Sequence, residues 1–288
     1  MAPTARAELD APARAALQAA LADCGVTLGT RLHSGSITDV YRGLESGRPV
    51  AIKLAAGPER VGSGAAALVA REHRALAALA HANIVRPVRF AARRGAAVLV
   101  LEYLPAGDLV PLAQEPPGRW IGAALAVVSA LRAVHDAGFV HGDLKARNVL
   151  FAADGTPKLI DFGSALPVGR RRGAGGRTPA HEPLRFAFEQ ASPAQDVYAL
   201  AVLLYELAAG RLPFGPAPGA FVPPAPIPAA TPAMRALAAR IAATLAAIEP
   251  GGVGTLLEFA DVLESVRDDA AAAGDGPPAE SPSAGAVR

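Results

Sequence analysis

The segment FVHGDLKARNVLF (139–151) contains three side chains that could do chemistry together. Asp143, Lys145 and Asn148 lie close together in it, just before an apolar stretch. A carboxylate can accept a proton, an ammonium group can neutralise negative charge, and an amide oxygen can bind a hard cation. Phosphoryl transfer uses such groups, because in that reaction the protein mainly positions the reactants and offsets their charge. The segment therefore raises the question of whether it is a phosphoryl-transfer centre.

Two residue types are rare in this chain, and their positions are informative for that reason. Lysine occurs only at positions 53, 145 and 158 and asparagine only at positions 83 and 148, whereas Ala, Arg, Gly and Pro are abundant. In a composition with this bias, mutational drift favours Arg over Lys. The lysines and asparagines that remain are therefore candidates for function.

The order and spacing of several short motifs carry more information than any one of them. AIK ends at Lys53 on a predicted strand, and Glu72 follows nineteen residues later on a predicted helix. The motif DFG (161–163) begins eighteen residues after Asp143, at the end of another predicted strand. In these features the sequence resembles the protein kinase family over about residues 27–265.

The resemblance implies a site for ATP and Mg²⁺. Lys53 would hold the α- and β-phosphates of ATP, and Glu72 would fix that lysine by an ion pair. Asn148 and Asp161 would be the metal ligands that hold Mg²⁺ against the phosphates.

The resemblance also implies where the adenine base would bind. The stretch LVLEYLPAGDL (99–109) is similar to the strand and hinge that grip the base in this family. Leu101 would lie at the back of the pocket, and backbone groups of Glu102 and Leu104 would meet the base. The remaining nucleotide-binding positions would be Leu32, Gly35, Val40, Ala51 and Leu150.

The catalytic residues implied by the resemblance are Asp143 and Lys145. Asp143 would orient the attacking hydroxyl and accept its proton, and Lys145 would neutralise charge on the transferring phosphate. A lysine two residues after the aspartate is the Ser/Thr form of this loop. We therefore expect an ATP-dependent Ser/Thr protein kinase, similar to bacterial kinases of that type with an HGD catalytic loop.

The glycine-rich loop departs from the family pattern. The family's G-x-G-x-x-G-x-V falls on His33, Gly35, Thr38 and Val40, so only the middle glycine remains. Glycines in such a loop let backbone N–H groups close over phosphates. The change indicates either a tolerated variant hairpin or a weakened grip on the nucleotide.

A second departure concerns the activation segment. Gly142 stands where many kinases have an arginine that pairs with an activation-segment phosphate. Between Asp161 and Glu189 the only hydroxyl side chains are those of Ser164 and Thr178. We therefore predict an enzyme that does not require phosphorylation of this segment.

The end of the same segment is also unusual. In RFAFEQ, Phe188 replaces the family's proline, and Val253 stands where an arginine would pair with Glu189. A carboxylate buried there without a partner would be costly. Either another arginine pairs with Glu189 or the site is more exposed to water.

Two other functions remain open. Small-molecule kinases of the aminoglycoside- or sugar-phosphorylating type commonly have HGD, but they usually lack DFG and the lysine found at Lys145. A pseudokinase scaffold is favoured by the eroded glycine loop and by the missing partner of Glu189. The presence of Lys53, Asp143 and Asp161 argues against that scaffold.

The predicted fold is α+β, a bilobal protein-kinase-like fold. Residues 27–104 form a small N-lobe of antiparallel sheet with one main helix, predicted at 66–80, and residues 105–267 form a mostly helical C-lobe. Residues 1–26 read as a helical extension, and residues 268–288 as a disordered tail with little to bury.

Composition narrows the setting. The 288 residues carry a net charge of +2, which is too balanced for nucleic-acid binding to be expected. Cys24 is the single cysteine, so no internal disulfide forms. The N-terminus has no signal-peptide pattern, and the most apolar run (197–209) is short and contains Glu206. We expect a cytoplasmic protein that binds a nucleotide and a protein substrate and contacts no membrane. The sequence indicates no oligomeric state.

Overall fold

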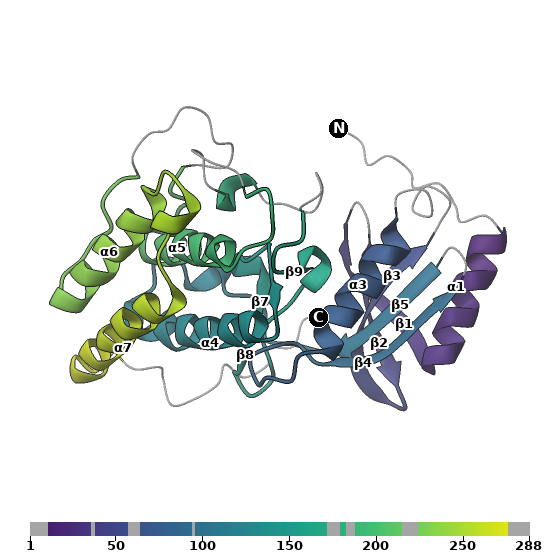
Figure 1. Cartoon of the computed structure of the whole chain (residues 1–288). Coiled ribbons are helices and arrows are strands. Elements are labelled where there is room, and N and C mark those ends of the chain that lie inside the picture. The colour runs from purple at the N-terminus through teal and green to yellow at the C-terminus, as the bar shows by residue number, and fades with distance from the viewer. Residues whose placement is uncertain are drawn as a thin grey trace, which may run out of the picture. The chain divides into compact units, whose positions relative to one another are not determined.

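Figure 1 shows the computed structural model of the chain. The chain divides into two compact units, the first made of residues 1–80 and 85–104 and the second of residues 81–84 and 105–288. The structure describes residues 11–35, 38–56, 64–93, 96–171, 179–182, 188–214 and 224–275.

The first unit is built on a five-stranded antiparallel sheet in the order β1-β2-β3-β5-β4. A two-residue turn joins β2 to β3, and both of its residues, Ser46 and Gly47, have positive φ of 48° and 80°. Positive φ at both positions suits a tight hairpin. The strands are β1 (Val26–Ser34), β2 (Asp39–Glu45), β3 (Arg48–Ala56), β4 (Pro87–Arg93) and β5 (Ala96–Glu102).

Two helices cover opposite faces of this sheet, as Figure 1 shows: α3 (Ala65–Ala77) on one and α1 (Ala11–Cys24) on the other. Alternate residues of a strand point to opposite faces, which lets one sheet hold two cores. Apolar side chains of β3, β4 and β5 form a core cluster with α1. Its buried members are Ala20, Cys24, Val26, Val50, Ile52, Leu54, Ala91, Val98 and Val100. The N-terminal helix is thus part of the first unit's core.

The second unit is mostly helical. Helix α7 (Leu256–Ala272) packs on α4 (Pro117–Asp136) and α6 (Pro232–Leu245), and α6 also packs on α5 (Pro193–Ala209). Helix α5 contains the most apolar run of the chain and is buried over most of its length. A capping box closes its first turn, with Ser192 and Gln195 each bonding the other's backbone.

Short strands and single turns connect these helices and carry the candidate catalytic and metal-binding residues. The strands form two small antiparallel pairs, β6 with β9 and β7 with β8. Their bounds are β6 (Phe139–Val140), β7 (Val149–Phe151), β8 (Pro157–Leu159) and β9 (Leu166–Pro167). The 3-10 turns are η1 (Val110–Leu112), η2 (Ala146–Asn148), η3 (Phe162–Ser164), η4 (Pro179–His181) and η5 (Pro250–Gly252).

The predicted disordered tail begins too early. Helix α7 continues to Ala272, and the amide of Asp275 donates to the carbonyl of Ala270 at 3.0 Å. Ala270 is buried because it continues the apolar stripe of Leu263 and Val266, and alanine is a strong helix former. The chain at Asp275 also lies so close to Gly118 of α4 that a side chain there would clash with it. The prediction of disorder is therefore wrong for residues 268–275.

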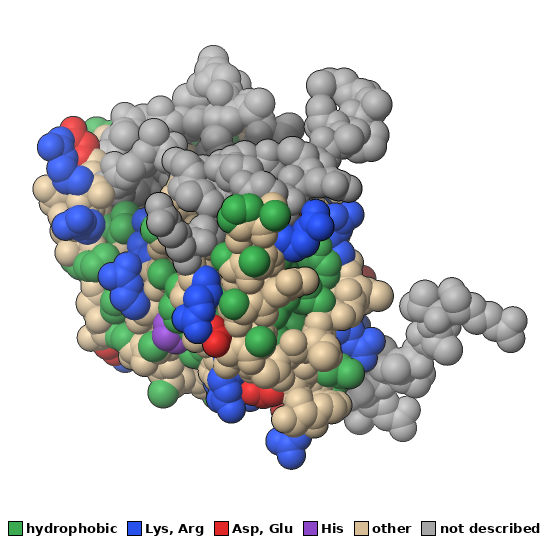
Figure 2. Space-filling model, turned by 90° about the vertical axis from the view of Figure 1, so that its right-hand side faces the viewer, with side chains coloured by type: hydrophobic (Ala, Val, Ile, Leu, Met, Phe, Trp, Pro, Cys, Tyr) green, Lys and Arg blue, Asp and Glu red, His purple; other side chains and the backbone are tan. Residues whose placement is uncertain are grey.

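Charged side chains are spread over the surface that Figure 2 shows. Lys and Arg side chains on this face are mostly separated by uncharged surface, with a few Asp or Glu side chains between them. Within the described residues, no helix combines the length and the apolar character that crossing a membrane requires.

Candidate active site

An ion pair inside the first unit joins the sheet to α3. Lys53 Nζ lies 2.6 Å from Glu72 Oε2, and the two side chains are 12% and 1% exposed. Glu72 occupies the buried face of α3, between Val69 and Leu76. A carboxylate in such a place is tolerable only when it is paired, so the contact with Lys53 positions both groups.

The sheet places other predicted residues on the same face as Lys53. Val40 lies directly opposite Lys53, and Ala51, two residues before Lys53, lies opposite Leu101. Side chains that are opposite or two apart share one face of a sheet. Val40, Ala51, Lys53 and Leu101 therefore form one continuous surface, as the resemblance implied.

The glycine-poor turn is only partly described. The amide of Gly35 donates to the carbonyl of Thr38 at 2.9 Å, and a side chain at Gly35 would lie 3.0 Å from that same oxygen. The one retained glycine thus permits a tight closure of the β1–β2 turn. Leu32 is 48% exposed and lies at an irregularity of the β1–β2 register.

The backbone amide of Glu102, at the end of β5, is one of the groups that the resemblance assigns to binding of the adenine base. The amide of Glu102 donates to the carbonyl of Arg86 at 3.1 Å, and the Glu102 carboxylate accepts from the Arg86 amide at 2.8 Å. The amide of Glu102 is therefore engaged within the fold. Leu104 is the last residue of the first unit, whereas Leu150 belongs to β7 of the second.

In the second unit, the side chains of Lys145 and Asn148 both contact that of Asp143. Lys145 Nζ lies 2.6 Å from Asp143 Oδ2. Asn148 Nδ2 donates to the Asp143 backbone oxygen at 2.8 Å and to Asp143 Oδ2 at 3.1 Å. A cation and an amide donor on one carboxylate oxygen fix the direction of the carboxylate.

A fully buried carboxylate on α5 anchors the loop that carries Asp143. Asp196 accepts from the backbone amides of His141 at 2.8 Å and Gly142 at 2.9 Å, and its Oδ2 lies 2.9 Å from Nε2 of His135. Burial alone would raise the pKa of Asp196, but the hydrogen bond and electrostatic effect of His135, the electrostatic effect of His141 and the hydrogen bond from the Gly142 amide outweigh it. The pKa of Asp196 therefore lies below its ordinary value, and the anchor is an anion.

The conformation of Gly142 explains why a glycine suits this position. Its φ is +78°, and a Cβ there would lie 3.1 Å from the carbonyl oxygen of Ser164. Residues with side chains are strained in this region of φ, whereas glycine is not. The backbone thus passes close to the segment that follows DFG.

Residue His141 links the catalytic loop to the strand that ends in DFG. The amide of Asp143 donates to His141 Nδ1 at 3.3 Å, so Nε2 carries the proton and donates to the carbonyl of Ile160 at 3.0 Å. The ring of Phe162 contacts His141 edge-on, with centroids 4.8 Å apart. Two buried rings therefore hold the chain on both sides of Asp161.

Asp161 and Asn148 are the oxygen donors that could hold a cation. The amide of Ile160 donates to the carbonyl of Asn148 at 2.9 Å, which brings the two segments side by side. Asp161 has a φ of +63°, a conformation that a non-glycine residue keeps only where its surroundings enforce it. Mg²⁺ characteristically takes few protein ligands plus phosphate oxygens. Asp161 and Asn148 fit that requirement, and within the described residues no group of three or more His, Cys, Asp or Glu side chains could hold a metal.

Backbone hydrogen bonds hold both described ends of the segment after DFG. Strand β9 pairs with β6, and the amide of Val168 donates to the carbonyl of Gly138 at 2.9 Å. At the far end, Gly169 donates to the carbonyl of Ala191, and Ala191 donates to that of Arg170, each at 2.8 Å.

The exposure of Glu189 explains why this carboxylate does not require an arginine partner. Glu189 is exposed, so the cost of a buried unpaired carboxylate does not arise, and Val253 is fully buried instead. Phe188, in the place of the family's proline, is buried as well. Thr178 lies outside the described residues.

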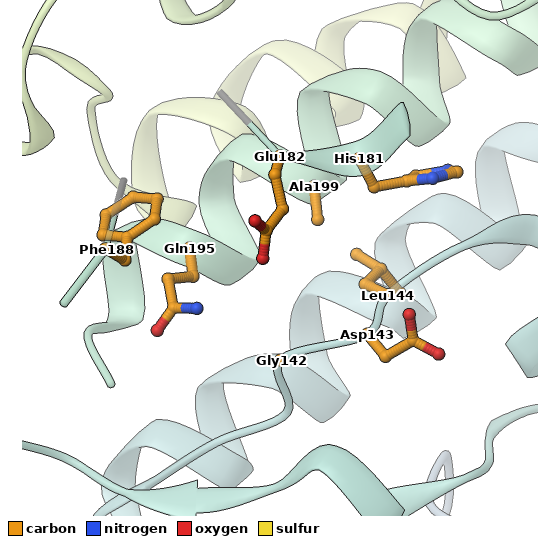
Figure 3. A pocket seen from close by; sticks show the side chains of 8 residues that line it. All are labelled: Gly142, Asp143, Leu144, His181, Glu182, Phe188, Gln195 and Ala199. Atoms are coloured by element: carbon orange, nitrogen blue, oxygen red, sulfur yellow. The ribbon is translucent and has the colours of Figure 1, made fainter. Parts of the chain in front are cut away.

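Two histidines of the second unit escaped the sequence analysis. His135, six residues before His141, contacts Asp196, and His181 lies beside the catalytic loop. A small cavity there, shown in Figure 3, is lined by residues from the catalytic loop, η4 and α5. The lining residues are Gly142, Asp143, Leu144, His181, Glu182, Phe188, Gln195 and Ala199. The spacing of six residues from His141 could have pointed to His135, but no local sequence pattern distinguishes His181.

Comparisons with known proteins agree with this architecture. Residues 26–220 match the family model described as Protein kinase domain. The chain is 33% identical over 208 residues to the serine/threonine-protein kinase pkn2 of Myxococcus xanthus and 33% identical over 221 residues to PknL of Mycobacterium tuberculosis. It is 36% identical over 205 residues to CBL-interacting protein kinase 4 of rice, Oryza sativa subsp. japonica.

These relatives are longer proteins. The matches cover 66%, 72% and 65% of this chain but 25%, 54% and 45% of pkn2, PknL and the rice kinase, respectively. The chain thus spans between a quarter and just over half of the length of the curated relatives it matches.

Proposed function

The chain belongs to the protein kinase domain family, and on that basis we propose that it transfers the γ-phosphate of ATP to a serine or threonine hydroxyl of a protein. The observation that carries this proposal is the contact of Asp143 with Lys145 and Asn148 on a loop anchored by Asp196. That arrangement supplies a carboxylate base, a neighbouring cation and a fixed backbone.

The chemistry follows from these groups. Asp143 orients the attacking hydroxyl and takes its proton as the oxygen attacks phosphorus. Lys145 offsets negative charge on the oxygens of the transferring phosphate. Asn148 holds the Asp143 carboxylate in place with its amide nitrogen, which leaves its amide oxygen available to bind a cation.

The nucleotide and the metal are held by the other predicted residues. Asn148 and Asp161 would hold Mg²⁺, which when bound would supply positive charge to offset that of the phosphates. Lys53, fixed by Glu72, holds the phosphates. Within the first unit, the side chains of Leu32, Val40, Ala51 and Leu101 would contact the base, near the backbone of Gly35, Glu102 and Leu104.

We further propose that the enzyme works without a phosphate on its activation segment. Gly142 offers no cation for such a phosphate, and its left-handed backbone disfavours the replacement of glycine by arginine. The β6–β9 pair and the hydrogen bonds between Ala191 and residues 169–170 hold the described ends of the segment in the unmodified chain, which supports the proposal.

The test is transfer of label from γ-³²P-ATP with Mg²⁺ to a mixed peptide substrate and to the protein itself. Asp143→Ala should abolish transfer, whereas the matched control Asp154→Ala, at an exposed turn of the same unit, should retain it. Phosphoamino-acid analysis should show phosphoserine or phosphothreonine, and phosphatase pretreatment should leave the rate unchanged. Absence of transfer to any protein or peptide by the wild type would overturn the proposal, and label on small sugars instead would identify a small-molecule kinase.

A further inference from the structure

His181 is a buried histidine that the mechanism above does not use. It is the last residue of η4, its side chain is 9% exposed, and it lines the cavity beside Asp143. Figure 3 shows the imidazole of His181 and the carboxylate of Asp143 projecting to the same side, with Leu144 between their backbones. The ring thus lies next to the proposed proton acceptor.

Neither nitrogen of the His181 ring has a hydrogen-bond partner among the residues that the structure describes. An unsatisfied polar group in a buried position destabilises the folded state. Burial lowers the pKa of His181 to about 4, an effect that the negative charge of Asp143 opposes and the positive charge of Lys145 strengthens. At neutral pH the ring is therefore uncharged and offers one donor and one acceptor.

The other described histidines of the second unit differ from His181. His141 and His135 bond Ile160 and Asp196, respectively, and His81 has Asn83 and Ser129 as partners. An apolar side chain would fill the site of His181 at a lower cost in folding free energy. Polar groups that are buried without partners concentrate at sites where a ligand completes them.

We propose that His181 hydrogen-bonds the phosphoacceptor residue of the protein substrate and holds its hydroxyl against Asp143. The inference rests on the proposed function and adds a substrate-binding residue to it. A serine or threonine residue offers complementary groups. Its hydroxyl oxygen can accept from the ring N–H while its proton is donated to Asp143, and a backbone N–H of an adjacent substrate residue can donate to the other ring nitrogen.

A matched pair of variants tests the hydrogen bonding separately from the shape. Glutamine and methionine have similar lengths, but only glutamine keeps a donor and an acceptor. We expect His181→Met to lower kcat/KM for a degenerate Ser/Thr peptide mixture about tenfold or more, since the loss of 1.4 kcal/mol is tenfold in rate. The fraction of consumed ATP whose phosphate reaches the peptide should fall as well, and His181→Gln should restore most of both.

The thermal midpoint distinguishes a binding role from a structural one. Because His181→Met replaces an unpartnered polar group by an apolar one, its Tm should equal or exceed that of the wild type while its activity falls. The control His81→Met removes a histidine that has partners, so its Tm should fall while the phosphorylated fraction is kept.

The outcomes separate the two proposals. Peptide phosphorylation by His181→Met within twofold of wild type, or equal losses in the Met and Gln variants with lowered Tm, would overturn the role of His181. A wild type that transfers no phosphate would overturn the proposed function and this inference with it. If His181→Met does not fold, His181→Leu and His181→Asn form the second matched pair, with the same expected difference.

Discussion

Asp196 and His135 form a buried pair, with 2.9 Å between Oδ2 and Nε2, that ties α5 to the end of α4. The same carboxylate holds the backbone of His141 and Gly142, so one side chain joins two helices and the catalytic loop. The loop is therefore positioned by the core of the second unit rather than by its own sequence.

Replacing this anchor should affect both stability and rate. Asp196→Asn puts an NH₂ group against donors, so we expect a loss of about 3 kcal/mol in the free energy of unfolding and a large fall in kcat. His135→Gln removes one of the three contacts and should cost less. Urea denaturation and peptide phosphorylation measure the two effects, and an Asp196→Asn variant with unchanged stability would contradict the anchoring role.

The ion pair of Lys53 and Glu72 should behave as one unit. Lys53→Met leaves a carboxylate that is 1% exposed without its cation, which should destabilise the protein by about 3–5 kcal/mol. The double variant Lys53→Met/Glu72→Leu should regain most of that stability but no activity. A double-mutant cycle on unfolding free energies checks this, and additive effects would show that the pair is not coupled.

The backbone at Gly142 should not tolerate a side chain. Gly142→Ala places a Cβ at a φ of +78° and 3.1 Å from the Ser164 oxygen, so we expect a loss of about 1–2 kcal/mol. Gly122→Ala, on an exposed face of α4 with nothing near its Cβ, should stabilise the helix by about 0.5–1 kcal/mol. Thermal unfolding of the two variants should shift in opposite directions.

Acid should weaken the fold through His181. Its folded-state pKa is lowered from 6.5 to about 4, so below pH 6.5 the unfolded chain binds a proton that the folded chain does not. Stability is therefore lost as pH falls from 6.5 to 4, by up to about 3 kcal/mol from this group. Asp196 adds little in that window, because its ordinary pKa of 3.8 lies below the window and its folded-state pKa is lower still.

The measurement is the unfolding free energy of wild type and His181→Met between pH 8 and pH 4. The variant should gain on the wild type progressively below pH 6.5. Parallel curves would show that His181 titrates alike in both states.

The thiol of Cys24 should be unreactive in the folded protein. Burial raises its pKa, and the negative charge of Asp23 raises it further, so little thiolate forms at neutral pH. Alkylation followed by mass spectrometry should be slow in buffer and rapid in denaturant. Fast labelling of the native protein would show that α1 leaves the sheet readily.

Local patterns were sufficient for much of this fold. The turn at Ser46-Gly47, the helix that carries Glu72 and the strands around DFG follow from short-range periodicity and turn residues. The chemistry was suggested by the motifs that contain Lys53 and Asp143, because these motifs follow one another in the order and at the spacing typical of the protein kinase family.

Contacts between distant segments could not be read in this way. A single histidine has no periodicity, so neither the partner of His135 nor the burial of His181 was visible in the sequence. The exposure of Glu189 depends on how its neighbours pack. The stripe of α1 is made of Ala, Leu and Cys, which shows that a face is buried but not what covers it.

The packing of α1 on the sheet also limits how far the chain can be truncated. Truncation to residues 26–220, the span of the family match, would remove α1 and leave Val50, Ile52 and Val100 open to water. It would also remove α6 and α7, on which α5 and α4 pack. Such a fragment should aggregate, and the shortest soluble form should retain residues 11–272.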